Sequence, residues 1–189
     1  MNDRDWLALL KTANHEFGSR LSTVTDWDAP TPDIGWSVRD LAAHVIEEQQ
    51  WVPYLLSGST LSQAKRKLAP LGDDLFAEWR LYSLGAGVAW HNVAPGTIVD
   101  LSRDRVPAED YLRELVSDVT IHTWDLARAI GASEELDPAL IDAVWTVFEP
   151  QQETLAASGL YAAPVPLPDD APLQSRLLAV TGRDDRIAA

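Results

Sequence analysis

An aspartate and a histidine, Asp118 and His122, stand four residues apart in the run SDVTIHTWDLARAIG. Residues with this spacing on a helix share one face, one turn apart, so both side chains are within reach of a common ion. His44 lies between the apolar residues Leu41 and Val45 of another helical pattern, which indicates that it points inward. Inward-facing carboxylates and imidazoles on neighbouring helices are the usual ligands of metal sites in helical bundles.

Two imidazoles and one carboxylate suit a divalent metal ion: Zn²⁺ is the first candidate, and Ni²⁺ or Fe²⁺ fit the same donors. Three protein ligands leave a fourth position for water or substrate, as in catalytic metal sites. A simpler interpretation stays open, since acid–histidine pairs also form on solvated helix faces and a lone histidine is often a satisfied core residue. From spacing alone, the simpler interpretation is the commoner one.

The elements that must position these residues are helical nearly throughout. Apolar residues recur at three- and four-residue steps in five segments, at about residues 6–21, 37–52, 75–91, 108–130 and 137–155. Gly131 suits a helix end, and Gly85 and Gly87 indicate close packing or a bend within the third segment. Pro53 is expected to kink or end the second. Only PGTIVDLSRDRVP has the composition of β-strands, and a short helical turn is expected at 173–180 in the Pro-rich tail.

Helix ends are marked by capping signals. Ser37 and Asp40 have capping-box spacing, and Asp137 precedes Pro138 at the first position of the last helix. We therefore expect an all-α fold: a four-helix bundle with a long crossover over residues 1–158, and an irregular Pro-rich extension over residues 159–189 packed on it.

Composition excludes several classes of function. The 189 residues carry a formal net charge of −14, which disfavours nucleic acid and anionic membranes as partners. The chain has no cysteine, which removes disulfides, thiolate metal sites and a cysteine nucleophile. Neither a signal peptide nor an apolar run of about 20 residues is visible, so a cytoplasmic location is expected. GxSxG, P-loop and Rossmann motifs are also missing.

A family resemblance sharpens the metal hypothesis. The runs GWSVRDLAAHV (35–45) and DVTIHTWDLARAIG (118–131), with the closing LLAVTGRDD, resemble actinobacterial metal-binding relatives of the mycothiol-dependent maleylpyruvate isomerase, within the DinB-like superfamily. The resemblance implies an up-down-down-up bundle with a divalent ion, usually zinc, on His44, Asp118 and His122. The isomerase resembles this pattern with Glu in place of Asp118 and carries a separate C-terminal domain, so the metal site is carried over here and the maleylpyruvate reaction is not.

Other residues are candidates for the surroundings of the metal. Trp51, His91 and Glu48 are expected to line a substrate pocket, and Glu47 or Glu48 could hold the imidazole of His44. Asp125 is expected to pair with Arg128 three residues on. Packing or solvated roles are expected for the remaining candidates, which are His15, Trp6, Trp36, Trp79, Trp124 and Trp145.

These observations predict a metal-dependent transferase or isomerase acting on a small organic substrate. The resemblance favours a thiol such as mycothiol as co-substrate, and a chain without cysteine has no thiol of its own to offer. The alternatives are a non-catalytic metal- or ligand-binding bundle, for which a homodimer is one expected form, and a bundle whose site no longer holds metal. A small molecule or a thiol is the expected partner.

Overall fold

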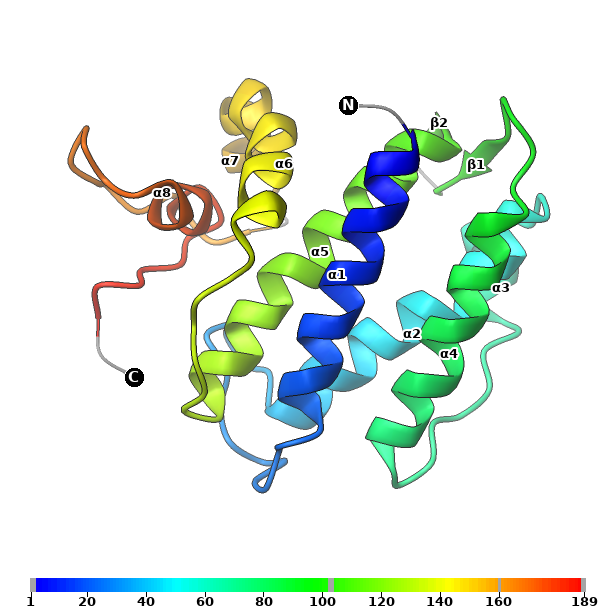
Figure 1. Ribbon diagram of the computed structural model, residues 1–189, viewed down its shortest axis with the longest axis horizontal. Helices are drawn as coiled ribbons and strands as arrows, with labels where there is room; N and C mark the ends of the chain where they lie inside the picture. Colours follow the sequence, from blue (N-terminus) through cyan, green and yellow to red (C-terminus); the bar gives the residue numbers. More distant parts are fainter. Residues whose placement is uncertain (1–2, 102–103, 160, 188–189) are drawn as a thin grey trace.

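Four long helices form the body of the protein. The computed structural model describes residues 3–101, 104–159 and 161–187. The four helices are α1 (Asp3–Leu21), α2 (Val38–Leu56), α4 (Leu75–His91) and α5 (Ala108–Ala129). In Figure 1, α1 and α5 run downwards whereas α2 and α4 run upwards, which is the up-down-down-up order. The predicted all-α four-helix bundle is confirmed.

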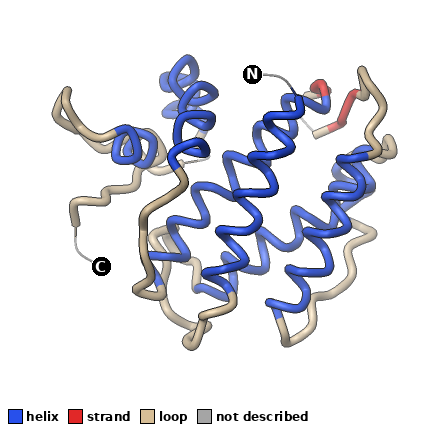
Figure 2. Tube along the Cα trace, viewed as in Figure 1, coloured by secondary structure: helices blue, strands red, loops and turns tan. Residues whose placement is uncertain are grey.

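The parallel course of α2 and α4 requires a long crossover between them. This crossover, residues 57–74, contains the short helix α3 (Leu61–Lys65), which the apolar pattern does not predict. Thr60 and Gln63 form its capping box, a signal present in the sequence but hidden by the shortness of the helix. Figure 2 shows that the crossover is otherwise loop.

The stretch with β composition forms a small hairpin between α4 and α5. Strand β1 (Ile98–Asp100) pairs antiparallel with β2 (Arg105–Pro107), with Val99 opposite Val106. Both strands lie at the upper end of the bundle, where the chain turns into α5 (Figures 1 and 2).

The chain after α5 is more broken than its apolar pattern predicts. Instead of one helix to residue 155, α6 (Pro138–Phe148) is followed by a 3₁₀ turn (Glu149–Gln151) and α7 (Gln152–Ser158). Pro150 lacks an amide hydrogen and its ring clashes with the preceding turn, which explains the break. The expected helical turn in the tail is α8 (Leu173–Ala179), which packs against α6.

Local capping signals were reliable guides to where helices begin. The side chain of Ser37 accepts a hydrogen bond from the backbone of Asp40 and the reciprocal bond is present, so the capping box is confirmed. Asp137 caps α6 as expected. Pro53, by contrast, does not end α2, which continues to Leu56.

Close packing or a bend was expected at two glycines of α4, and the close packing is absent. A Cβ atom added at Gly85 or Gly87 would meet no atom within 4 Å among the described residues. The outward face of α4 is instead apolar and exposed, with Leu81, Leu84 and Val88 between 56% and 69% exposed. These glycines therefore weaken the helix without an evident packing role within the chain.

No helix among the described residues is long and apolar enough to cross a membrane.

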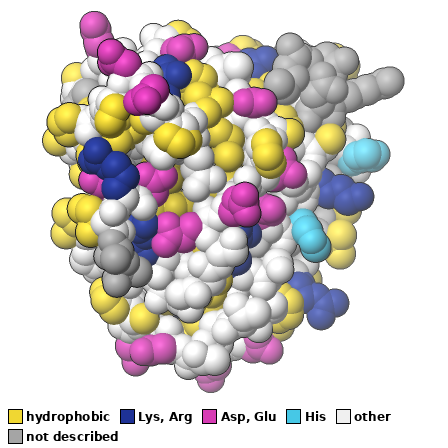
Figure 3. Space-filling model, turned by 60° about the vertical axis from the view of Figure 1, so that its left-hand side comes forward, with side chains coloured by type: hydrophobic (Ala, Val, Ile, Leu, Met, Phe, Trp, Pro, Cys, Tyr) yellow, Lys and Arg dark blue, Asp and Glu magenta, His cyan; other side chains and the backbone are white. Residues whose placement is uncertain are grey.

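The surface carries many of the acidic side chains that give the chain its negative charge. On the face that carries α6 and α8, acidic side chains stand at several separate places among apolar and basic ones, rather than in one patch (Figure 3).

Candidate metal centre

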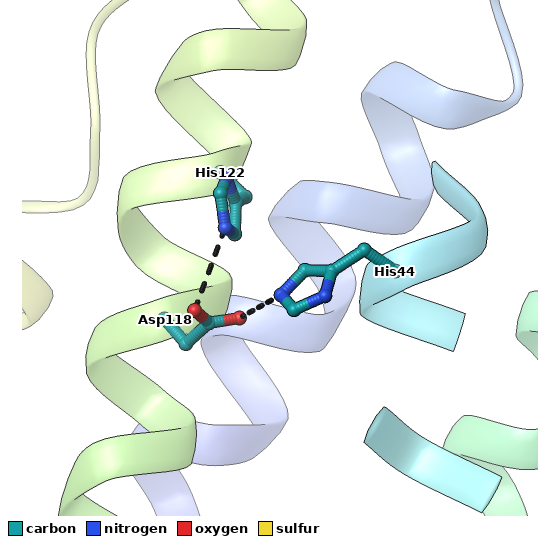
Figure 4. Close-up of side chains that lie close together, drawn as sticks. All are labelled: His44, Asp118 and His122. Atoms are coloured by element: carbon teal, nitrogen blue, oxygen red, sulfur yellow. Dashed lines mark ion pairs between the residues drawn. The ribbon is translucent and has the colours of Figure 1, made fainter. Parts of the chain in front are cut away.

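Helices α2 and α5 bring the three predicted metal ligands together. Asp118 and His122 project from one face of α5, and His44 reaches towards them from α2 (Figure 4). The Nε2 atom of His122 lies 3.4 Å from Oδ1 of Asp118, and Nε2 of His44 lies 3.7 Å from its Oδ2. One ligand atom from each residue can be chosen so that all three lie within 4.8 Å of one another.

These separations suit a metal ion better than they suit direct hydrogen bonds. Hydrogen bonds between nitrogen and oxygen span up to about 3.2 Å. Ligand atoms about 2.0–2.1 Å from a tetrahedral zinc ion lie about 3.4 Å from one another. Oδ2 of Asp118 is moreover buried and, among the described residues, has no hydrogen-bond partner, since Nε2 of His44 is 3.7 Å away. A buried carboxylate oxygen left unpaired between two imidazoles fits a divalent cation.

In the metal-free cluster, burial and neighbouring charges act on the pKa values in opposite directions. Burial alone would raise the pKa of Asp118, but the imidazoles of His122 and His44 hold it well below its usual range. Burial likewise opposes the charge on His122, yet Asp118 and Asp125 raise its pKa to about 10. Since a metal requires a neutral imidazole nitrogen and an ionised carboxylate, binding would release the proton of His122.

The other ring nitrogen of His122 is held by a separate, closed network. Its Nδ1 lies 3.0 Å from Oδ2 of Asp125, one turn further along α5. Arg183, from the C-terminal segment, donates to both carboxylate oxygens of Asp125 over 2.7 and 2.6 Å, and one of its nitrogens also reaches Asp33 at 3.3 Å. Asp125 is fully buried and Arg183 is 8% exposed. Such a carboxylate fixes both the tautomer and the orientation of a ligand histidine.

The expected pairing of Asp125 with Arg128 is therefore wrong. Arg128 turns away and binds the carboxylate of Glu134 and the backbone carbonyls of Asp184 and Asp185. The neighbouring Asp125 is instead the buried partner of Arg183, which lies 58 residues further along the chain.

A glycine allows the C-terminal segment to make this approach. Gly182 adopts a positive φ of 78°, and a Cβ atom there would lie 2.9 Å from the backbone of Ala162. Any side chain would thus clash with the start of the C-terminal segment at Ala162 and displace the backbone just before Arg183.

The cluster opens onto a cavity of about 1450 Å³. Its walls come from α2, α5, α6, α7 and the C-terminal segment, and include His44, Asp118 and His122. Trp36, assigned above to packing alone, also lines it: its ring is stacked on His122 with centroids 5.8 Å apart and lies 4.9 Å from the ring of His44. Its place just before the Ser37 cap gives no sign of this contact.

Two of the three expected pocket residues lie at the cavity. Trp51 and Glu48 line it, and Oε1 of Glu48 is 3.9 Å from Nε2 of His44. Burial and the charge of Asp118 raise the pKa of Glu48. The pocket position expected for His91 is not found: His91 is exposed at the end of α4, and no residue of that helix lines the cavity.

The other candidates make no hydrogen bond or ion pair with the three ligands among the described residues, although Glu47 lines a shallow surface hollow with His44. Glu47 and His15 are exposed. Trp6, Trp79, Trp124 and Trp145 are all buried, as expected for packing residues, although Trp6 also lines the cavity.

Fold and cluster together define a class of protein, the helical bundles with a candidate His–Asp–His metal site between two of their helices. The model of the mycothiol maleylpyruvate isomerase N-terminal domain matches residues 7–127. The chain belongs to this family.

Relatives in sequence extend over almost the whole chain. Uncharacterised proteins of two Mycobacterium tuberculosis strains, CDC 1551 and H37Rv, are each 30% identical over 193 residues, covering 96% of this chain and all of the relative.

Solved structures show the same fold. A crystal structure of the mycothiol-dependent maleylpyruvate isomerase superposes with a TM-score of 0.71 at 17% identity, covering 97% of this chain and 90% of the isomerase chain. A mutant of that isomerase superposes with a TM-score of 0.61 at 18% identity, covering 76% and 68% of the two chains. The first match includes most of the C-terminal segment, so the likeness in fold is not limited to the four long helices.

Proposed function

We propose that this protein binds one divalent metal ion, zinc being the first candidate, through His44, Asp118 and His122. With it the protein acts as a transferase or isomerase on a small organic substrate. The observation that carries the proposal is the unpaired, buried oxygen of Asp118 between two imidazoles at the wall of a large cavity. The thiol co-substrate, mycothiol or a similar molecule, is inferred from the named activity of the isomerase with the same fold.

The residues around the cluster have separable tasks. When bound, the ion would supply Lewis acidity that lowers the pKa of a thiol or water at its open position. Asp125 holds the Nδ1 proton of His122, so that Nε2 faces Asp118. Trp36 lies against the rings of both imidazoles and limits their movement. Glu48 has its Oε1 3.9 Å from Nε2 of His44 and is placed to take up or deliver a proton there.

Metal content tests the proposal directly. Protein purified without a histidine tag is analysed for metals as wild type, His44→Ala, His122→Ala and the control His91→Ala, whose side chain is exposed and away from the cavity. We expect one zinc or other divalent ion per chain in wild type and in His91→Ala, and none in the other two variants. A wild type that stays free of metal after incubation with divalent ions would overturn the proposal.

A further inference from the structure

The walls of the cavity carry an excess of acidic side chains. Its lining includes five carboxylic acids, Asp33, Glu48, Asp110, Glu114 and Asp118, but only two arginines, Arg113 and Arg183. Both arginines already have carboxylate partners: Arg113 pairs with Asp110, and Arg183 with Asp125 and Asp33. Among the described lining residues, then, neither arginine is left to bind a carboxylate group of a ligand.

Three of these acids form a regular line along α5. Every fourth residue from Asp110 through Glu114 and Asp118 to His122 lines the cavity, so an acidic stripe leads along one helix face to the metal cluster. Like charges at this spacing destabilise a helix. On α5 itself, Asp110 pairs with Arg113 and Asp118 with His122, whereas no ion pair of Glu114 is found among the described residues. Repulsion between the acids of this stripe therefore lowers the stability of α5.

A buried hydroxyl lies on the same wall. Tyr111 is only 5% exposed and lines the cavity, and its hydroxyl makes no short hydrogen bond among the described residues; the side chain of Trp51 is its hydrogen-bonding neighbour. It lies seven residues before Asp118, about 10 Å along the helix axis from that ligand. A hydroxyl can donate to or accept from an uncharged polar group, and the surrounding acids do not oppose such a group as they oppose an anion.

We propose that the cavity selects ligands without carboxylate groups, so that its thiol or other substrate is uncharged or cationic beyond the atom that meets the metal. This inference rests on the function proposed above. The +2 charge of the ion is partly balanced by Asp118 and would be balanced further by one bound thiolate. Additional negative charge on the ligand would then face Glu114 and Asp33 with no free cation among the described lining residues.

Cobalt-loaded protein allows this selectivity to be measured by binding, without knowledge of the reaction. Co²⁺ takes the place of zinc, and a thiolate bound to it gives a charge-transfer band in the near ultraviolet. The protein is titrated with 2-mercaptoethanol, cysteamine, 3-mercaptopropionate and mercaptosuccinate, which differ mainly in charge. We expect the dissociation constant of mercaptosuccinate to exceed that of 2-mercaptoethanol by at least about tenfold, a ratio that shrinks as salt is added.

The variant Glu114→Gln removes one acid of the stripe and no metal ligand. It is expected to lower the mercaptosuccinate to 2-mercaptoethanol ratio about threefold or more while leaving the constant for 2-mercaptoethanol within about twofold. The control Glu109→Gln makes the same change of charge at a residue of α5 that does not line the cavity, and is expected to leave the ratio unchanged.

The outcomes separate this inference from the proposed function. Equal affinities for all four thiols, tighter binding of the dicarboxylate, or a ratio that Glu114→Gln leaves unchanged would overturn the inference and leave the metal site standing. Failure of Co²⁺ to bind would overturn both. Bound Co²⁺ without a thiolate band for any probe would overturn the thiol chemistry and this inference together.

Discussion

Two polar clusters meet at the imidazole of His122, one at each ring nitrogen, and they differ in how completely their groups are paired. On the Nδ1 side, both oxygens of Asp125 accept hydrogen bonds from Arg183, and the carboxylate also holds the imidazole. On the Nε2 side, Oδ1 of Asp118 lies 3.4 Å from Nε2, and its other oxygen has no hydrogen-bond partner within the described part of the chain. The first cluster, Asp125 with Arg183, is complete within the protein and is called the closed cluster below. The second, Asp118 with His44, lacks a partner and is called the open cluster.

This difference distinguishes the residues that position His122 from those that could bind a ligand. Buried polar groups are almost always hydrogen-bonded in native proteins, so an unpaired one at a cavity wall indicates a ligand. The paired cluster fixes the direction of the ring, which makes the open side geometrically defined before a ligand arrives. Because Arg183 belongs to the C-terminal segment, that segment takes part in positioning a candidate metal ligand on α5.

Opening the closed cluster should have the largest effect on stability. In Arg183→Met, Asp125 stays fully buried but loses both hydrogen bonds from the guanidinium group. Removing one partner of a buried ion pair typically costs about 3–5 kcal/mol in the free energy of unfolding. Metal affinity should also fall about 10–100-fold because His122 loses its fixed orientation. Urea denaturation and chelator competition measure the two effects.

Arg128→Met is the matched control for this experiment. Arg128 also joins α5 to the C-terminal segment, but its partner Glu134 is partly exposed, with 31% of its side chain accessible. We expect a loss of about 1 kcal/mol and unchanged metal affinity, since a partly exposed pair is screened by solvent. If Arg183→Met is no more destabilising than Arg128→Met, the closed cluster does not have the role assigned to it.

The open side should make the metal-free protein sensitive to pH. The pKa of His122 is raised from its ordinary value near 6.5 to about 10 in the folded protein. Its protonation therefore stabilises the fold fully below pH 6.5, and this contribution is lost as pH rises towards 10. The free energy of unfolding should fall with pH in this window by up to about 1.4 kcal/mol per unit for one proton. Glu48, whose pKa is also raised, acts in the same direction.

Denaturation in the presence of a chelator at pH 6, 7, 8 and 9 checks this dependence. His122→Gln should flatten the slope, whereas Glu48→Gln should leave the part that belongs to His122. With metal present the affinity should rise over the same range, because binding displaces the proton from Nε2. A stability that stays constant or increases between pH 6.5 and 9 in the metal-free wild type would contradict the prediction.

Short-range signals in the sequence predicted the open cluster better than the closed one. The spacing of Asp118 and His122 and the apolar neighbours of His44 are local patterns, and the structure brings these three side chains together. The link between Asp125 and Arg183 joins residues 58 apart, so no helical period reveals it. The local alternative, a pair with Arg128 one turn away, was chosen for its spacing and is wrong.

The short range of sequence signals also explains which helices were predicted correctly. Helices marked by capping residues, such as Ser37 and Asp137, begin where expected. An apolar pattern that continues past Pro150 did not reveal the break there, because periodicity records which face is buried and not whether the backbone is continuous. Trp36 was missed for a related reason, since its contact with two imidazoles depends on how a loop folds back over α2 and α5.

The smallest effect we predict concerns the start of α2, which positions the one ligand that α5 does not supply. Ser37→Ala removes the cap of α2, seven residues before His44, and should lower the free energy of unfolding by about 1 kcal/mol. Thr60→Ala removes an equivalent capping box from α3, which carries no candidate ligand. Both variants should lose similar stability in urea, but only Ser37→Ala should weaken metal binding, by less than about tenfold, because fraying of the first turn of α2 lets His44 leave its position. Equal metal affinities in the two variants would mean that packing against α4 and α5 alone holds His44 in place. The position of His44 in the open cluster would then not depend on the cap of α2.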